Sequence, residues 1–319
     1  MSKASTLAAA AVFTALTVQA QQKPVRLSIA TGGTGGVYYP LGGGLANVLS
    51  KSLPGVEATA EVTSASVDNI KLIGAGKADL AFSLSDTASD GFNGTGKFKE
   101  KVPIRSVAVL YANKSQWVTV EGRGIEKMQD LKGKRISTGA PGSGTETIAV
   151  RILEAYGFDP DKDVKREKLS VAESVNAIKD RKIDAFFWSG GVPTAAVTDL
   201  AATPGNTIKL LDHSEVIPKL VQKYGSLYVK GTIPAKSYPG QTKDAHVADV
   251  WNVLVVHEKM EEKLVYDIVK TVFEKKADLV AVHSEAANLE LSTQYQGGSP
   301  IPFHPGAVRY FGEKGLRPR

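Results

Sequence analysis

The sequence contains no cysteine and, after its first twenty positions, no long apolar run. Without cysteine there is no disulfide framework and no thiolate metal site. No later stretch approaches the roughly 20 apolar residues that a membrane-spanning helix needs. A chain of 319 residues must therefore be held together by ordinary apolar cores, and its length predicts two domains of roughly 150 residues each.

Signatures of catalysis are also scarce. The five histidines are well separated, with no H-x-x-x-H pair, so we expect no metal site and no cofactor. The glycine-rich loop at 32–36 has neither G-x-x-x-x-G-K-[ST] nor a clean G-x-G-x-x-G. The serine loops at 141–145 and 187–191 do not fit a G-x-S-x-G nucleophile elbow. These features argue against an enzyme, which remains an alternative together with a ligand sensor for a membrane kinase.

The charge balance is mildly basic, with a formal net charge of +6 at pH 7. Basic residues are interleaved with acids, as in the segment 162–168, which is typical of a solvated surface rather than a nucleic-acid face. A weak positive potential would favour anionic ligands. We expect no nucleic-acid partner, and we expect a monomer.

The first twenty residues have the pattern of a signal peptide. Lys3 precedes an apolar run at 7–18, and Val18-Gln19-Ala20 provides a small-residue cleavage site. We therefore expect cleavage after Ala20 and a periplasmic protein.

Apolar patterning then alternates between strand and helix. Residues 25–30 alternate as a strand, and the apolar positions at 41, 45, 48 and 49 follow Pro40 at helical spacing. The same order recurs over 67–84 and, through the glycine-rich loop 139–144, over 134–156. Such alternation predicts an α/β fold with mostly parallel sheets and helices on their faces.

Segments 77–82 and 182–187 resemble each other, because each joins the end of a helix to a buried strand. Two similar lobes would produce this pattern, and so would the residues that commonly end a helix before a strand. Strand-like runs at 105–111, 117–121 and 250–256 are interpreted as segments that carry the chain to a second lobe and back. The expected division is a signal peptide at 1–20, a first lobe at 21–116 and 249–319, and a second lobe at 117–248.

Four loops at predicted helix starts carry hydroxyl side chains, and three of them also contain glycines. They are 31–36, which precedes Tyr38 and Tyr39, and 63–66, 142–145 and 189–194. Backbone N–H groups and the helix dipole make such loops receptors for a carboxylate or phosphate, and in open α/β sheets the ligand lies beyond the carboxyl ends of the strands.

Capping offers a second interpretation of the same side chains. Ser143 and Ser170 both begin an S-x-x-E capping box. Ser143 is therefore either a helix cap or a ligand contact, whereas Ser170, without glycine neighbours, is expected to be a cap. Asp86 either caps the following helix or accepts a hydrogen bond from a ligand. Of Tyr38 and Tyr39, one is expected to touch the ligand.

Taken together, six segments resemble the TAXI family, the solute receptors of one branch of tripartite (TRAP) transporters. These segments are 30–40, 63–69, 78–86, 139–146, 189–194 and 301–307. They occur in the expected order over nearly the whole chain after residue 20.

The resemblance implies a two-lobed, type II-like periplasmic binding protein, with crossing strands between the lobes and a ligand in the cleft. It also implies delivery of glutamate, glutamine or a related dicarboxylate to TRAP membrane permease subunits. The ligand-binding residues that it implies are Thr34, Tyr38, Ser66, Asn69, Ser85, Asp86, Ser143, Gly144, Thr145 and Ser189. Two positions depart from the family pattern: Leu84 replaces a usual Gln, and Ala65 replaces a usual Gly. The ligand is therefore expected to be a small organic anion or amino acid.

Overall fold

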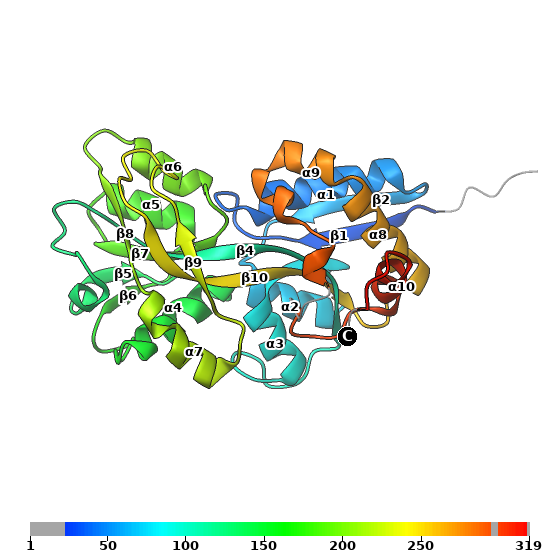
Figure 1. The fold of residues 1–319 in the computed structure, drawn as a ribbon, viewed down its shortest axis with the longest axis horizontal. Coiled ribbons are helices and arrows are strands. Elements are labelled where there is room, and N and C mark those ends of the chain that lie inside the picture. The colour runs from blue at the N-terminus through cyan, green and yellow to red at the C-terminus, as the bar shows by residue number, and fades with distance from the viewer. Residues whose placement is uncertain (1–22, 295–298, 318–319) are drawn as a thin grey trace, which may run out of the picture.

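The computed structural model describes residues 23–294 and 299–317. The expected signal peptide lies outside these residues. The chain forms two lobes side by side, with strands β4 and β10 running through both of them (Figure 1).

The first lobe contains the beginning and the end of the chain. Its elements are β1 (Val25–Ala30), α1 (Tyr38–Ser52), β2 (Val56–Glu61), α2 (Ser66–Gly74), β3 (Leu80–Leu84), α3 (Ser85–Asn93), α8 (Glu262–Glu274), α9 (Lys276–Val282), η3 (Ser284–Asn288), η4 (Ser292–Gln294) and α10 (Pro305–Glu313).

The second lobe contains the middle of the chain. Its elements are η1 (Met128–Leu131), β5 (Arg135–Ser137), α4 (Gly144–Ala155), β6 (Lys165–Glu167), α5 (Val171–Lys179), β7 (Ala185–Gly190), α6 (Ala195–Ala202), β8 (Ile208–Leu211), η2 (Ser214–Val216), α7 (Ile217–Tyr224) and β9 (Val229–Ile233).

Both lobes repeat one β-α-β-α-β unit. In the first lobe β1 lies between β2 and β3 and is parallel to both, and in the second lobe β5 lies in the same way between β6 and β7. Strands β4 and β10 add antiparallel neighbours, so the sheet is mixed. Helices cover both faces of each lobe (Figure 1). The predicted two-lobed α/β fold is confirmed.

The two similar sequence segments occupy equivalent places in these units. Asp79 precedes β3, and its carboxylate accepts a hydrogen bond from the backbone N–H of Ser28 in β1 at 2.8 Å. Asp184 precedes β7, and its carboxylate accepts from the backbone N–H of Arg135 in β5 at 3.0 Å. Asp79 therefore links β3 to β1 within the first lobe, and Asp184 links β7 to β5 in the same way within the second lobe.

Strands β4 (Ile104–Val120) and β10 (Ala245–His257) are long enough to belong to both lobes. The predicted runs at 105–111 and 117–121 are the two ends of the single strand β4. They looked separate because the polar residues 113–116 lie between them, where β4 passes from one lobe to the other. The expected lobe boundaries at 116/117 and 248/249 fall inside these two strands.

Candidate ligand-binding site

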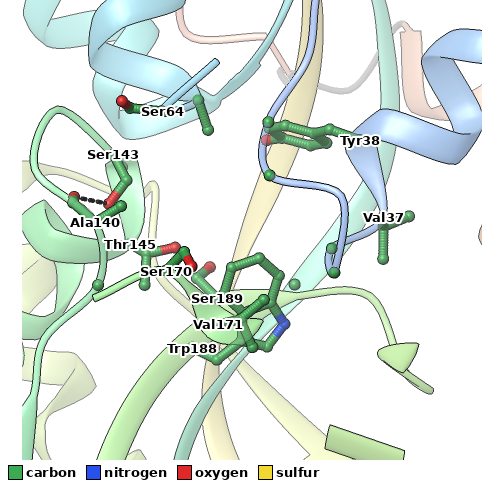
Figure 2. Close-up of a pocket in the computed structure, with 18 of the residues that line it drawn as sticks. Val37, Tyr38, Ser64, Ala140, Ser143, Thr145, Ser170, Val171, Trp188 and Ser189 are labelled. Carbon is green, nitrogen blue, oxygen red and sulfur yellow. Dashed lines mark hydrogen bonds between the residues drawn. The ribbon is translucent and has the colours of Figure 1, made fainter. Parts of the chain in front are cut away.

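A cavity of about 340 Å³ lies between the lobes and is lined from both of them (Figure 2). This volume is at the lower end of the roughly 300–1,000 Å³ of small-molecule sites. The lining residues are Gly32–Tyr38, Val62–Ser66, Leu84, Tyr111, Asn113, Gly139, Ala140, Ser143–Thr145, Ser170–Glu173 and Trp188–Gly190.

Four helices begin at the cavity. They are α1, α2, α4 and α5, and each follows one of the parallel strands β1, β2, β5 and β6. In a parallel strand–helix unit the loop after the strand leads directly into the helix N-terminus, so the free N–H groups of four helices gather at one place. Their dipoles favour a negatively charged ligand group.

The lining has almost no charged side chain. Among the described residues around the cavity there is no lysine, arginine, histidine or aspartate, and Glu173 is the single carboxylate. Glu173 is exposed, and its carboxylate accepts a hydrogen bond from the backbone N–H of Ser170 at 2.9 Å. Positive potential in the cavity therefore comes from backbone groups.

Tyr38 presents its ring to the cavity and uses its hydroxyl elsewhere. The ring stacks on Phe82 with centroids 5.2 Å apart, and the hydroxyl donates a hydrogen bond to the Asn252 side chain in β10. Burial raises the pKa of Tyr38 far above its usual value, so the hydroxyl stays neutral. Tyr39 is 37% exposed and does not line the cavity.

Two buried hydroxyls at the cavity have no hydrogen-bond partner among the described residues. They belong to Tyr111 in β4, which is 1% exposed, and Ser189 in β7, which is 4% exposed. Buried polar groups are nearly always paired in native proteins, so these two hydroxyls have unused hydrogen-bonding capacity beside the cavity. Ser189 was among the predicted residues. Tyr111 was not, because it belongs to a strand-like run that reads as core.

Apolar surfaces complete the lining where the lobes meet. The Trp188 indole N–H donates to the Thr194 hydroxyl at 2.8 Å, which leaves the ring as an apolar surface. This ring packs against Gly36 of the first lobe, where an added Cβ would lie 2.9 Å from Trp188 Cη2. At Gly144 an added Cβ would lie 2.6 Å from the Leu84 side chain. These two glycines therefore let the lobes close on each other.

Seven of the ten predicted site residues line the cavity: Thr34, Tyr38, Ser66, Ser143, Gly144, Thr145 and Ser189. The Ser143 hydroxyl accepts from the Glu146 N–H at 3.0 Å and donates to the Ala140 carbonyl at 2.6 Å. Ser143 thus caps α4 at the edge of the cavity.

The other three predicted residues, Asn69, Ser85 and Asp86, do not line the cavity, and we do not retain them as ligand contacts. The Asn69 amide donates to the backbone carbonyls of Thr31 and Phe82 at 2.7 and 2.8 Å, so it joins β1 to β3. Ser85 is the first residue of α3 and is fully buried.

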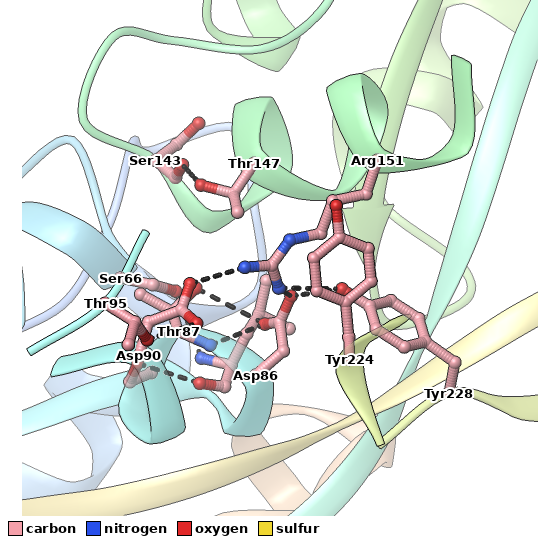
Figure 3. A network of polar contacts seen from close by, with 12 residues as sticks. Ser66, Asp86, Thr87, Asp90, Thr95, Ser143, Thr147, Arg151, Tyr224 and Tyr228 are labelled. Carbon is pink, nitrogen blue, oxygen red and sulfur yellow. Dashed lines mark hydrogen bonds and ion pairs between the residues drawn. The ribbon is translucent and has the colours of Figure 1, made fainter. Parts of the chain in front are cut away.

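Asp86 belongs to a buried cluster that joins the lobes (Figure 3). Its Oδ2 accepts hydrogen bonds from Arg151 Nη1 at 2.9 Å and from the Tyr228 hydroxyl at 2.6 Å. Arg151 Nη2 also lies 2.5 Å from Asp90 Oδ2, and its guanidinium carbon lies 4.1 Å from the centroid of the Tyr224 ring. Asp86 does not line the cavity. It is not the N-cap residue of α3, but its Oδ1 accepts a hydrogen bond from the Thr87 backbone N–H in the first turn at 2.7 Å.

One lining segment was not predicted as part of the site. Ser170 and Glu173 form the expected capping box at the start of α5, with Ser170 accepting from the Glu173 N–H at 3.3 Å. The segment also lines the cavity, because α5 occupies the same place in the second lobe as α2 does in the first. The similarity of segments 77–82 and 182–187 was the signal that could have located it.

Ala65, which replaces a glycine of the resembled family, has a strained backbone. Its φ is 79° and its ψ is −145°, a conformation that is rarely adopted by residues other than glycine. The strained residue immediately precedes α2 and lines the cavity.

Within residues 23–294 and 299–317, no group of three histidine, aspartate or glutamate side chains is placed to hold a metal ion. Over the same residues, no helix combines the length and the apolar character needed to cross a membrane.

Two solved structures with a similar fold are solute-binding proteins. A binding-protein component of a phosphonate ABC transporter from Pseudomonas aeruginosa is 11% identical, with a TM-score of 0.53 over 84% of this chain and 80% of that one. An ancestral arginine-binding protein bound to arginine is 16% identical, with a TM-score of 0.50 over 82% of this chain and 98% of that one. The chain itself belongs to the NMT1-like family, whose pattern matches residues 29–315.

Proposed function

We propose that this protein is an extracytoplasmic solute receptor that closes its lobes around a small organic anion or amino acid and delivers it to a membrane transporter. The observation that carries the proposal is the cavity between the lobes, at which four helix N-termini meet. A ligand that contacts both lobes favours their closed arrangement, and a membrane partner can recognise that arrangement.

The composition of the cavity favours binding over catalysis. A hydrolytic or proton-transfer mechanism needs a base beside the reacting group. Of the residues that line the cavity, Glu173 is the single candidate, and it is exposed and hydrogen bonded to Ser170. Turnover of a bound compound by the purified protein would contradict the receptor function.

The transporter is proposed to be of the TRAP type, with its receptor in the periplasm. Supporting this, the loops that carry the TAXI resemblance at 31–38, 63–66, 142–145 and 189–190 supply much of the cavity lining. The genes adjacent to this one provide the test. TRAP permease genes are expected there, whereas a membrane kinase gene would favour a ligand sensor.

Thermal unfolding with a panel of organic anions and amino acids tests ligand binding directly. A ligand present at 100 times its Kd stabilises the native state by about 2.7 kcal/mol. We expect Thr145→Val to weaken binding about 2- to 10-fold through loss of one hydrogen bond. Thr147→Val, two residues further along α4 and outside the cavity, is the matched control. Equal affinities for both variants and the wild type would remove Thr145 from the site.

A further inference from the structure

We propose that the cavity selects a solute with a single carboxylate and an uncharged, largely apolar remainder, and that Tyr111 and Ser189 hydrogen bond an oxygen of that solute. This inference rests on the proposed receptor function and specifies its substrate class.

The charges around the cavity set the charge of the solute. One carboxylate can be placed where the helix N-termini meet, because it can accept hydrogen bonds from their unpaired N–H groups, and this effect falls off within the first turn of each helix. A second buried carboxylate would need a cationic side chain, and a buried ammonium would need a carboxylate. Among the described lining residues there is no cation, and the carboxylate of Glu173 is exposed and already bonded. Diacids and α-amino acids are therefore disfavoured.

Two cations at the junction of the lobes are already paired with carboxylates. Arg151 is held by Asp86 and Asp90 in the cluster between α3 and α4. Lys114 in β4 is paired with Asp249 in β10 at 2.5 Å. Neither cation lines the cavity, so neither supplies a counter-charge to a second anionic group of the solute.

The remainder of the solute would face apolar surface. The Trp188 ring, whose N–H is already bonded to Thr194, lies in the lining with Val62, Val171 and Leu84. Leu84 contributes an apolar side chain where β3 ends at the cavity. An aliphatic group fits these surfaces, whereas a charged group would lose its hydration without compensation.

The unpaired hydroxyls indicate where a solute oxygen lies. Tyr111 and Ser189 are buried, line the cavity and have no hydrogen-bond partner among the described residues. Burial raises the pKa of Tyr111 well above its usual value, so its hydroxyl remains a neutral donor. A carboxylate, carbonyl or hydroxyl oxygen of the solute would satisfy these hydroxyls, as buried polar groups require.

Three compounds of one shape provide the test. They are 2-oxoglutarate, 5-methyl-2-oxohexanoate and 2-amino-5-methylhexanoate. In 5-methyl-2-oxohexanoate an isopropyl group replaces the second carboxylate of 2-oxoglutarate. In 2-amino-5-methylhexanoate an ammonium group replaces the oxo group of 5-methyl-2-oxohexanoate. Titration calorimetry should show at least about tenfold tighter binding of the oxo monocarboxylate than of the other two. Equal or tighter binding of 2-oxoglutarate or the amino acid overturns the inference but leaves a receptor. Failure of all three, together with glutamate and glutamine, overturns both the inference and the proposed ligand range.

Variants test the two hydroxyls. Tyr111→Phe and Ser189→Ala are each expected to weaken binding of the oxo monocarboxylate about tenfold, as for a hydrogen bond to a charged or strongly polar acceptor. Ser115→Ala is the matched control, because this hydroxyl on β4 is also buried and has no partner in the described part of the chain, but it does not line the cavity. Unchanged affinity for both cavity variants, or the same loss in Ser115→Ala, contradicts the assignment.

Mass spectrometry of solute released from freshly purified protein should find a monocarboxylate, and a diacid or amino acid would overturn the class.

Discussion

Two buried polar regions join the lobes, the cavity in Figure 2 and the cluster around Arg151 in Figure 3, and they are built in opposite ways. In the cluster, a cation is surrounded by two carboxylates, a phenol hydroxyl and an aromatic ring. The cavity has no buried charged side chain among its described residues and two hydroxyls without partners.

The difference separates buried polar groups that stabilise the fold from buried polar groups that can bind a ligand. A fully paired buried network rigidifies the lobes and leaves no hydrogen-bonding capacity for a ligand. An incompletely paired one costs folding free energy until a ligand supplies the missing partner. Residue type alone does not make this distinction, because Asp86 looked more like a ligand contact than Tyr111 did.

The largest expected effect comes from removing the cation of the cluster. Arg151→Met leaves the buried carboxylate of Asp86 and the half-buried carboxylate of Asp90 without their cation, and we expect the free energy of unfolding to fall by about 3–5 kcal/mol. Chemical denaturation measures this change. Lys182→Met is the control, because its pair with Asp180 is largely exposed and contributes about 0–1 kcal/mol. Equal losses in the two variants would show that the cluster does not hold the lobes.

One chemical change made at two tyrosines compares the regions directly. Tyr228→Phe removes a hydroxyl that donates to Asp86 at 2.6 Å, and the free energy of unfolding should fall by about 1–3 kcal/mol. Tyr111→Phe removes a buried hydroxyl that has no partner within residues 23–294 and 299–317, so without ligand its unfolding free energy should be unchanged or higher. If both variants lost the same stability without ligand, Tyr111 would be paired within the protein.

The smallest effect is expected from the strained residue at the cavity. Ala65→Gly removes the steric conflict at φ 79°, and the unfolding free energy should rise by about 0.5–1 kcal/mol. Ala140→Gly, in the lining loop of the other lobe, is the control. Ala140 is not among the residues with positive φ, so this change should lower stability slightly through backbone entropy. A loss in Ala65→Gly as large as in the control would argue against strain at this position.

Local patterns predicted the framework of the site well. The expected strand at 25–30 is β1, and the apolar spacing after Pro40 and the glycine loop at 139–144 correctly indicated α1 and α4. These features depend on side-chain periodicity and turn chemistry within one segment, so they can be read from the segment itself. Loops 31–36 and 142–145 contribute to the cavity because parallel strand–helix units place such loops at one edge of a sheet.

The sequence by itself determined the α/β units, their helix-start loops and the capping box at Ser170, because each depends on neighbours within a few positions along the chain. Only the tertiary structure decided that Asp86 pairs with Arg151, 65 residues away, and with Tyr228, 142 residues away. It likewise placed Tyr111, a residue of the buried core, at the edge of the cavity. The physical reason is that the partner of a buried polar group depends on how the two lobes pack, and no local pattern of residues encodes that contact.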